Sequence, residues 1–354
     1  MNHSFIYNSL PFKVVFGRPA ADVLPEVVQE LGYKRVLVLC TPEQRVQAEA
    51  FAKVLGAFGV GICDLATMHV PVEKVADAAE QAKLLRADCT LAIGGGSTIG
   101  LAKALSLKMA LPSIAIPTTY AGSEMTPVWG LTENGRKTTG KDPAVQPKAV
   151  IYDPELTLSL PVDMSVTSGI NAIAHAVEGL YAKDANPVIS LLAEDGIRAL
   201  AQGLPGIVKN PQDLQARTQC QYGAWLCGMV LGSVGMALHH KLCHTLGGSF
   251  NLPHAQMHTA LLPHALAYNS THVPEACARI ERALGTQNAA QGLFDLAKNN
   301  GAEMALSSFG FSEAQIDEAL DIALHNPYWN PRPLEREALH QLLSNACIGA
   351  RPNA

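Results

Sequence analysis

Charged residues are scarce in this chain. Asp, Glu, Lys and Arg make up 16% of its 354 residues, the formal net charge is -5, and the isoelectric point is near 6.2. No basic stripe or block of like charge occurs, which argues against nucleic acid as a partner. No apolar run is long enough to predict a membrane span. The N-terminus also lacks the basic-then-apolar order of a signal peptide, so we expect a cytoplasmic protein with no membrane partner.

Paired cysteine motifs are missing as well. The eight cysteines are scattered through mostly apolar segments, and no C-x-x-C pair occurs. This distribution predicts buried free thiols in a reducing compartment. Cys243 stands among several histidines, but the interior of a helix offers a thiol little activation, so its setting favours a packing role over a nucleophilic one.

The apolar content, 48% of the chain, suffices for a large core and favours two domains. In residues 1–155, short apolar or β-branched runs alternate with amphipathic helical stretches, which predicts a parallel sheet covered by helices. Residues 1–17 alternate like a strand pair. The other expected strands are Arg35–Cys40, Val60–Leu65, Cys89–Ile93, Ser113–Ile116 and Ala149–Tyr152, and the expected helices lie near Ala21–Leu31, Pro42–Leu55, Val72–Leu85 and Thr98–Lys108.

Residues 156–354 have a different sequence pattern. Long Ala- and Leu-rich segments with helical period follow Asp153-Pro154 and contain no convincing strand, so we expect an all-helical second domain. The segment Asn326–Pro333 is too rich in proline for a regular element and predicts an ordered loop.

Six of the twelve histidines fall between Gly235 and His264. The first part of this stretch is an apolar run with imidazoles at four-residue spacing, and it predicts a helix that ends at Gly247-Gly248. His240 and His244 would share one face of that helix, while His239 would point away from it.

A second apolar element is expected to start at Pro253-His254, so His254 could approach the first helix from across the bend. A single buried histidine is more often a hydrogen-bonded core residue than a functional one. A whole set of them brings many polar nitrogens that need partners, so the set indicates a functional site.

A glycine-rich loop, Gly94-Gly95-Gly96-Ser97-Thr98, follows a buried strand and opens a helix. Its glycines allow the backbone to approach an anion closely, and the helix N-terminus and the two hydroxyls supply donors for a pyrophosphate. A merely tight turn would need one glycine. The spacing does not match the G-x-G-x-x-G fingerprint, so the loop alone is a weak signal.

Further candidates for cofactor binding lie nearby in the sequence. Thr118 and Thr119, within Pro117–Glu124, follow the next strand and are expected at the same carboxyl edge of the sheet. Lys137 could hold a ribose or phosphate oxygen, although a solvated surface lysine is the commoner role for such a residue.

With these segments assembled, the chain resembles the iron-containing alcohol dehydrogenase superfamily along nearly its whole length. The similar segments are the early Phe16-Gly17 turn, GGGS at 94–97, PTT at 117–119, GSE at 122–124, DPELTLSLP at 153–161, the Asn171/His175 helix, the histidine stretch and the late Asn330-Pro331-Arg332. The resemblance implies a Rossmann-like nucleotide-binding α/β domain and an all-α domain, arranged as in dehydroquinate synthase, and a homodimer.

Within that superfamily, the segments YNSLPFKVVFG, TSGINAIAHAVEGLYA and LHHKLCHTLGGSFNLPHA are similar to the maleylacetate reductase family. That resemblance implies NADH- or NADPH-dependent reduction of maleylacetate, a small dicarboxylate, to 3-oxoadipate in the breakdown of aromatic and chloroaromatic compounds. For that reaction we expect His244 and His254 to polarise and protonate the substrate, with His175 and His240 completing the pocket. Asn171 would be a neutral hydrogen-bonding partner, and Arg332 and Lys241 are candidates, on their chemistry alone, for binding the substrate carboxylates.

Two departures from the superfamily pattern bear on the cofactors. Metal-dependent members hold iron or zinc at positions that correspond here to Asn171, His175, His240 and His254, so an amide replaces the one acidic ligand and tight metal binding is doubtful. Three neutral imidazoles can still bind zinc, so a metal on these histidines stays open. At the end of the first parallel strand, Thr41 replaces the common ribose-binding aspartate, which removes repulsion toward the 2′-phosphate of NADPH.

Other functions remain open from the sequence. The first is a metal-dependent alcohol dehydrogenase of the same superfamily, with zinc or iron on His175, His240 and His254. The second is a lyase resembling dehydroquinate synthase, which oxidises and re-reduces its coenzyme within one cycle. A nucleotide-sensing module has little need for the histidine set.

Overall fold

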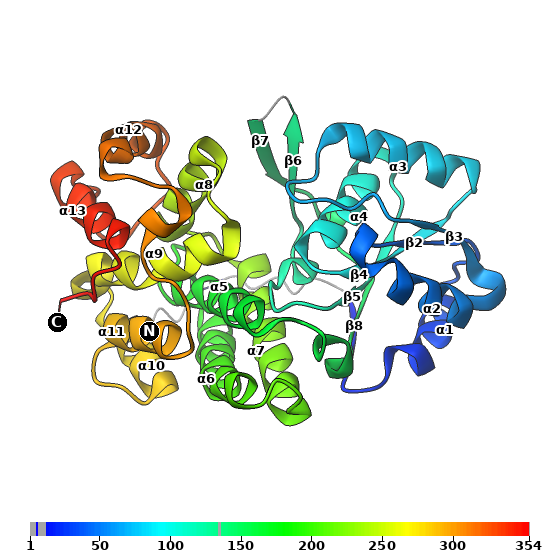
Figure 1. Cartoon of the computed structure of the whole chain (residues 1–354), viewed down its shortest axis with the longest axis horizontal. Helices are drawn as coiled ribbons and strands as arrows, with labels where there is room; N and C mark the ends of the chain where they lie inside the picture. The colour runs from blue at the N-terminus through cyan, green and yellow to red at the C-terminus, as the bar shows by residue number, and fades with distance from the viewer. Residues whose placement is uncertain (1–4, 6–11, 134–135, 354) are drawn as a thin grey trace. The chain divides into compact units, whose positions relative to one another are not determined.

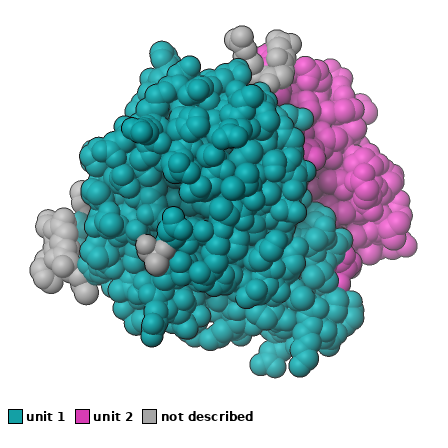
Figure 2. All heavy atoms as spheres, turned by 60° about the vertical axis from the view of Figure 1, so that its left-hand side comes forward, with its two compact units in different colours: residues 1–8, 161–354 teal, residues 9–160 magenta. Residues whose placement is uncertain are grey.

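The chain divides into two compact units, residues 9–160 and residues 161–354 together with Phe5 (Figure 2). A computed structural model describes Phe5, residues 12–133 and residues 136–353. The division falls a few residues beyond the boundary expected at residue 155. Apart from Phe5, the first half of the strand pair expected in residues 1–17 lies outside the described residues; in the second half, Lys13–Phe16 is a strand.

The first unit, called the sheet unit below, contains six parallel strands in the order β1-β8-β5-β4-β2-β3 (Figure 1). The strands are β1 (Lys13–Phe16), β2 (Val36–Leu39), β3 (Gly59–Cys63), β4 (Cys89–Gly94), β5 (Ser113–Pro117) and β8 (Ala149–Tyr152). The central strands read as continuous apolar runs because helices cover both faces. The expected parallel sheet is therefore confirmed.

Four helices cover the sheet, two on each face: α1 (Ala20–Glu30), α2 (Arg45–Leu55), α3 (Val72–Leu84) and α4 (Gly96–Met109). Side chains of α1 and α2 share one core with alternate strand residues such as Val38 and Leu91. Side chains of α3 and α4 share a second core with Leu37 and Leu39, which point to the opposite face. A two-stranded antiparallel sheet, β6 (Val128–Glu133) and β7 (Arg136–Lys141), was not expected from the sequence.

The second unit, called the helical unit below, has no strand among its described residues, as expected. Its α-helices are α5 (Val162–Leu180), α6 (Pro187–Lys209), α7 (Leu214–Ser233), α8 (Leu238–Phe250), α9 (His254–Asn269), α10 (Pro274–Leu284), α11 (Ala289–Asn299), α12 (Ile316–His325) and α13 (Arg336–Cys347). The proline-rich loop lies between α12 and α13. Of the described helices, none is long and apolar enough by itself to cross a membrane; α7 and α8 reach that length and composition only as a pair bent by 94°.

The expected glycine stop of the histidine helix is wrong. Helix α8 continues through Gly247 and Gly248 to Phe250, and Asn251 ends it in the left-handed conformation with φ 55°. A Cβ atom on Gly247 would lie 3.3 Å from Cε of Met257 on α9. This glycine therefore serves the close approach of two helices, while asparagine, which tolerates positive φ, supplies the stop.

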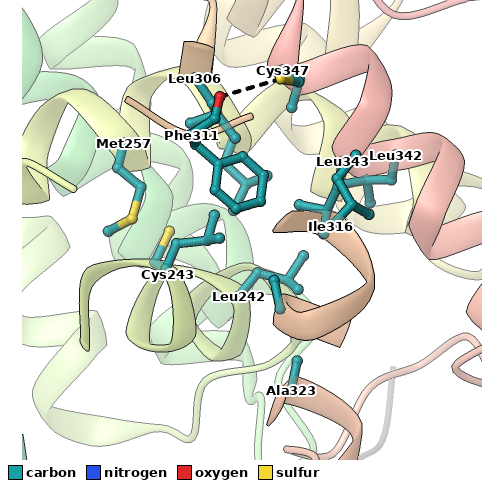
Figure 3. Packing of buried hydrophobic residues seen from close by; sticks show 14 of the residues in the cluster. Leu242, Cys243, Met257, Leu306, Phe311, Ile316, Ala323, Leu342, Leu343 and Cys347 are labelled. Atoms are coloured by element: carbon teal, nitrogen blue, oxygen red, sulfur yellow. Dashed lines mark hydrogen bonds between the residues drawn. The ribbon is translucent and has the colours of Figure 1, made fainter. Parts of the chain in front are cut away.

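Helix α8 has two different faces. One carries His240 and His244, and the other packs Leu242 and Cys243 against α9, α12 and α13 in an apolar core of the helical unit (Figure 3). All eight cysteines are free, and seven of them, Cys243 included, are buried, so the prediction of buried free thiols is confirmed apart from the half-buried Cys277. Burial raises the pKa of the Cys243 thiol well above its usual value, which favours packing over nucleophilic chemistry.

We predict that Leu242→Ala destabilises the helical unit, because Leu242 is fully buried beneath the histidine face. Loss of its side chain should lower the free energy of unfolding by about 2–5 kcal/mol. Leu191→Ala is the matched control, since Leu191 on α6 is 66% exposed and should change stability by less than about 0.5 kcal/mol. Urea denaturation of both variants measures the difference, and equal effects would contradict the core described above.

Candidate functional site

Three neighbouring strands bring the predicted cofactor residues to one edge of the sheet. The loop Gly94–Thr98 follows β4, Thr118 and Thr119 follow β5, and Thr41 follows β2; β5, β4 and β2 are adjacent and parallel. The backbone N–H of Thr118 donates to the carbonyl of Gly94 at 3.1 Å, so the two loops touch. This carboxyl edge is where open α/β sheets bind their ligands.

Gln44, which the sequence analysis missed, links two of these loops. Its Nε2 atom donates to Oγ1 of Thr118 at 3.1 Å, and its Oε1 atom accepts a long hydrogen bond of 3.5 Å from Oγ1 of Thr41. A glutamine five residues after the end of a strand carries no sequence signal of its own.

The three glycines of the loop have different functions. A Cβ atom on Gly94 would lie 2.5 Å from Oγ1 of Thr98, and one on Gly95 would lie 2.8 Å from Cγ2 of Thr119, so packing requires glycine at both positions. A Cβ atom on Gly96 would meet nothing within 4 Å. No side chain caps the N-terminus of α4. Open space beside an uncapped helix N-terminus suits a phosphate group.

A buried lysine, Lys103, stabilises the chain that follows β5. Nζ of Lys103 on α4 donates to the carbonyls of Ser123 and Val128 at 2.6 and 2.7 Å and to Oγ1 of Thr126 at 2.9 Å. Burial lowers the pKa of Lys103 to about 7, although the nearby carboxyl of Glu124 opposes that shift. Lys103 was not among the predicted residues, and its apolar sequence context was the available signal.

Lys137 lies on β7 opposite Thr132. Its side chain lies outside the described residues, so its contact with the cofactor stays a prediction.

Three helices of the helical unit bring the predicted histidines together. Helix α5 carries Asn171 and His175, α8 carries His239, His240 and His244, and α9 carries His254 and His258. The ring centre of His240 lies 5.1 Å from that of His175, 6.1 Å from that of His244 and 5.1 Å from that of His258. His254 joins the group through His258, with 4.3 Å between their ring centres. The four predicted catalytic histidines therefore belong to one cluster.

The cluster has an exposed part and a buried part. His244 and His254 are exposed, whereas His175 and His240 are each 4% exposed. Burial, reinforced by the neighbouring imidazoles, lowers the pKa of His175 well below its usual value. His175 is therefore neutral near pH 7 and can act there only as a hydrogen-bonding group, while the two exposed rings are accessible to a ligand.

His239 and His258 form a hydrogen-bonded pair that the sequence analysis did not assign. Nε2 of His239 lies 3.0 Å from Nδ1 of His258, and Sγ of Cys243 lies 3.7 Å from the same nitrogen of His239. Burial lowers the pKa of both imidazoles well below the usual value. One neutral imidazole donates to the other in this contact, while Nδ1 of His239 and Nε2 of His258 are buried without a hydrogen-bond partner.

An aromatic side chain, Tyr328, contacts the exposed part of the cluster, and a cationic side chain, Lys241, lies near that tyrosine. The hydroxyl of Tyr328, in the proline-rich loop, lies 2.9 Å from Nδ1 of His244. Nζ of Lys241 lies 5.5 Å from the centre of the Tyr328 ring. Tyr328 was missed because a loop tyrosine far away in sequence gives no sign of its contacts, whereas Lys241 was one of the two cations considered for substrate carboxylates.

Arg332, the other cation, uses its guanidinium within the protein. Nη1 donates to the carbonyl of Tyr268 at 3.0 Å, Nη2 donates to Glu335 at 2.8 Å, and Cζ lies 4.1 Å from the centre of the Tyr268 ring. These contacts favour a role in fixing the proline-rich loop on the end of α9. Binding of a substrate carboxylate by Arg332 stays a prediction.

The residues at the superfamily's metal positions fit a divalent metal poorly. Asn171 offers an amide, a weaker ligand for a divalent cation than a carboxylate. Among the described residues, one set of His, Cys, Asp or Glu side chains gathers at least three donor atoms within 4.8 Å of one another, and it is His239, Cys243 and His258. His175, His240 and His254 do not form such a set. Oδ1 of Asn171 is buried without a hydrogen-bond partner, so it is available to another polar group.

Sequence models of two related families match the chain: "Iron-containing alcohol dehydrogenase" over residues 11–154 and "Fe-containing alcohol dehydrogenase family, C-terminal" over residues 165–347. A maleylacetate reductase of Burkholderia cepacia is 55% identical over 351 residues, covering 99% of this chain and 100% of the relative. A maleylacetate reductase of Sphingobium indicum is 56% identical over 98% of this chain and 99% of the relative. The crystal structure of maleylacetate reductase from Agrobacterium tumefaciens matches with a TM-score of 0.96 at 48% identity, covering 99% of this chain and 100% of that one.

The glycine loop generates a prediction for Gly96→Ala. The added methyl group meets no protein atom within 4 Å, so the melting temperature should stay within a few degrees of the wild-type value. A phosphate group seated at the N-terminus of α4 would meet that methyl group, so the dissociation constant for NADH should rise by roughly tenfold or more, equivalent to about 1.4 kcal/mol. Fluorescence titration with NADH measures the affinity, and an unchanged dissociation constant would show that the diphosphate binds elsewhere.

Proposed function

Because this chain belongs to the iron-containing alcohol dehydrogenase family, we propose that it reduces maleylacetate to 3-oxoadipate with NADH or NADPH, in the breakdown of aromatic and chloroaromatic compounds. The observation that carries the proposal is the identity of 50–56% with proteins named maleylacetate reductase over nearly the whole of both chains. The expected membership of the family and the expected oxidoreductase activity are confirmed by the same relatives.

The sheet unit binds the coenzyme in this proposal. Gly94, Gly95 and Gly96, with the hydroxyls of Ser97, Thr98, Thr118 and Thr119, surround the uncapped N-terminus of α4, where the diphosphate would bind. Thr41 occupies the end of β2 without a negative charge, so the 2′-phosphate of NADPH meets no repulsion there, and both coenzymes are accepted.

The helical unit supplies the proton donors. Bound NADH or NADPH supplies a hydride, which adds to the carbon–carbon double bond conjugated with the ketone and leaves an enolate oxygen. His244 and His254, the two exposed members of the cluster, stabilise that oxygen by hydrogen bonding and provide the proton that completes the reduction at the adjacent carbon. Neutral His175 and the amide of Asn171 orient the substrate from the buried side.

The substrate is a dianion at neutral pH and needs fixed cations. Lys241 is half-buried on α8, and its ammonium group lies 5.5 Å from the centre of the Tyr328 ring, whose hydroxyl contacts the proposed catalytic residue His244. Arg332 is already paired with Glu335 and the carbonyl of Tyr268. Lys241 is therefore the stronger candidate for a substrate carboxylate, and Arg332 the weaker.

We further propose that the reaction needs no bound metal, since an amide occupies the acidic ligand position and the three family histidines do not gather their donor atoms. Eight free thiols suit the reducing cytoplasm, where we place the enzyme. We also propose a homodimer, to which strand β1, at one edge of the six-stranded sheet, could contribute.

The activity is tested by following NADH and NADPH absorbance at 340 nm with freshly prepared maleylacetate. One coenzyme should be oxidised for each 3-oxoadipate formed, which also separates a reductase from a lyase that regenerates its coenzyme. His254→Asn should lower kcat by roughly a hundredfold or more because the proton donor is lost, with little change in coenzyme affinity. His272→Asn, at an exposed position in the same unit, should be neutral.

Two results would contradict the proposal. The first is turnover of simple primary alcohols without turnover of maleylacetate. The second is a His254→Asn enzyme with the kcat of the His272→Asn control.

A further inference from the structure

Glu178 is a buried carboxylate that no prediction from the sequence included. It lies on α5, three residues after His175, and is 0% exposed. An isolated buried carboxylate is unfavourable by several kcal/mol, so its partners are informative. Those partners all come from the start of α8, the helix that carries His239, His240 and His244.

The carboxylate of Glu178 caps α8 from another helix. Its Oε2 atom accepts from the backbone N–H of Ala237 at 2.7 Å, and its Oε1 atom accepts from that of His239 at 2.6 Å; the N–H of His240 lies 3.4 Å from Oε2. Helix α8 has no capping side chain of its own. The negative charge therefore satisfies the first N–H groups of α8 and complements the positive end of its dipole.

The same carboxylate contacts the imidazole of His240, with 2.8 Å between Oε2 and Nδ1. An ionised carboxylate only accepts hydrogen bonds, so this contact requires the proton on Nδ1. Nε2 of His240 is then left with its lone pair. That nitrogen is buried without a hydrogen-bond partner and belongs to the ring that neighbours His175, His244 and His258.

We propose that Glu178 is a positioning residue of the reductase site: it holds His240 in the tautomer with a bare Nε2 and fixes the start of α8, and thereby His244 one turn further on. A bare Nε2 can accept a hydrogen bond from the substrate, from a solvent molecule or from a neighbouring imidazole. Glu178 itself touches no reacting atom. The inference rests on the proposed function for its kinetic consequence, but its structural content can be measured without any substrate.

The substrate-free test is nitrogen NMR of the full-length protein labelled with ¹⁵N in the histidine rings. The His240 signals are assigned by their loss in His240→Asn. We expect Nδ1 protonated and Nε2 unprotonated in the wild-type protein near pH 7.5. A proton on Nε2 instead would overturn the inference, whatever the activity of the enzyme. If the protein shows the expected tautomer but does not reduce maleylacetate, the inference about Glu178 is supported and the proposed function is contradicted.

The kinetic test compares Glu178→Gln, Glu178→Asp and Glu275→Gln. The glutamine amide places a donor where the carboxylate accepted, so kcat for maleylacetate should fall by roughly 10–100-fold, with NADH affinity unchanged and the His240 tautomer altered. Aspartate keeps the charge and should restore part of kcat. Glu275 is exposed and pairs only loosely, at 3.7 Å, with Arg279 one turn along the helix, so its variant should match the wild-type enzyme.

A folded Glu178→Gln protein with wild-type kcat would overturn the proposal. If Glu178→Gln does not fold, two measurements still test the proposal: the tautomer of His240 in the wild-type protein and the kcat of Glu178→Asp. A folded aspartate variant that keeps the proton on Nδ1 of His240 but recovers none of the wild-type kcat would also contradict the proposal.

Discussion

The arrangement of the histidine cluster in the helical unit depends on one buried carboxylate. Glu178 accepts the first N–H groups of α8 and the imidazole of His240 at once, so the direction of that helix and the protonation of its ring are set by the same charge. The opposite face of α8 is held by a close-packed apolar core around Leu242 (Figure 3). The start of α8 and its apolar face are therefore both held by the rest of the helical unit, which favours preorganised histidines.

The proposal that this member of the iron-containing alcohol dehydrogenase family works without a metal rests on the charges of the same cluster. A divalent cation needs an anionic ligand to balance its charge, and the acidic ligand position here is an amide. The buried acid of α5, Glu178, already accepts hydrogen bonds from the start of α8 and contacts His240. Burial keeps His175, His239 and His258 neutral, so the cluster does not repel itself and leaves its exposed members to meet a dianionic substrate.

Much of this could be predicted from the sequence, and the exceptions have physical causes. Alternating apolar runs predicted the parallel sheet and the carboxyl edge where the glycine loop lies, because those features depend on local periodicity. The β6–β7 pair was missed because polar residues in both strands mask the alternation, although the sequence between them, Asn-Gly, is a strong hairpin signal. The helix stop at Gly247 was wrong because that glycine serves packing against Met257. Glu178 and Tyr328 were missed because their partners are distant in the sequence, although an acid within the apolar helix around His175 was a usable signal.

The central claim is that protein imidazoles, and not a metal, stabilise the developing enolate oxygen. It is tested most directly by measuring maleylacetate reduction after exhaustive chelation, with the metal content of the same sample determined by mass spectrometry. The account predicts full kcat at a metal content far below one atom per chain, and no stimulation by added zinc or iron. Loss of activity on chelation that is restored by added metal would contradict it.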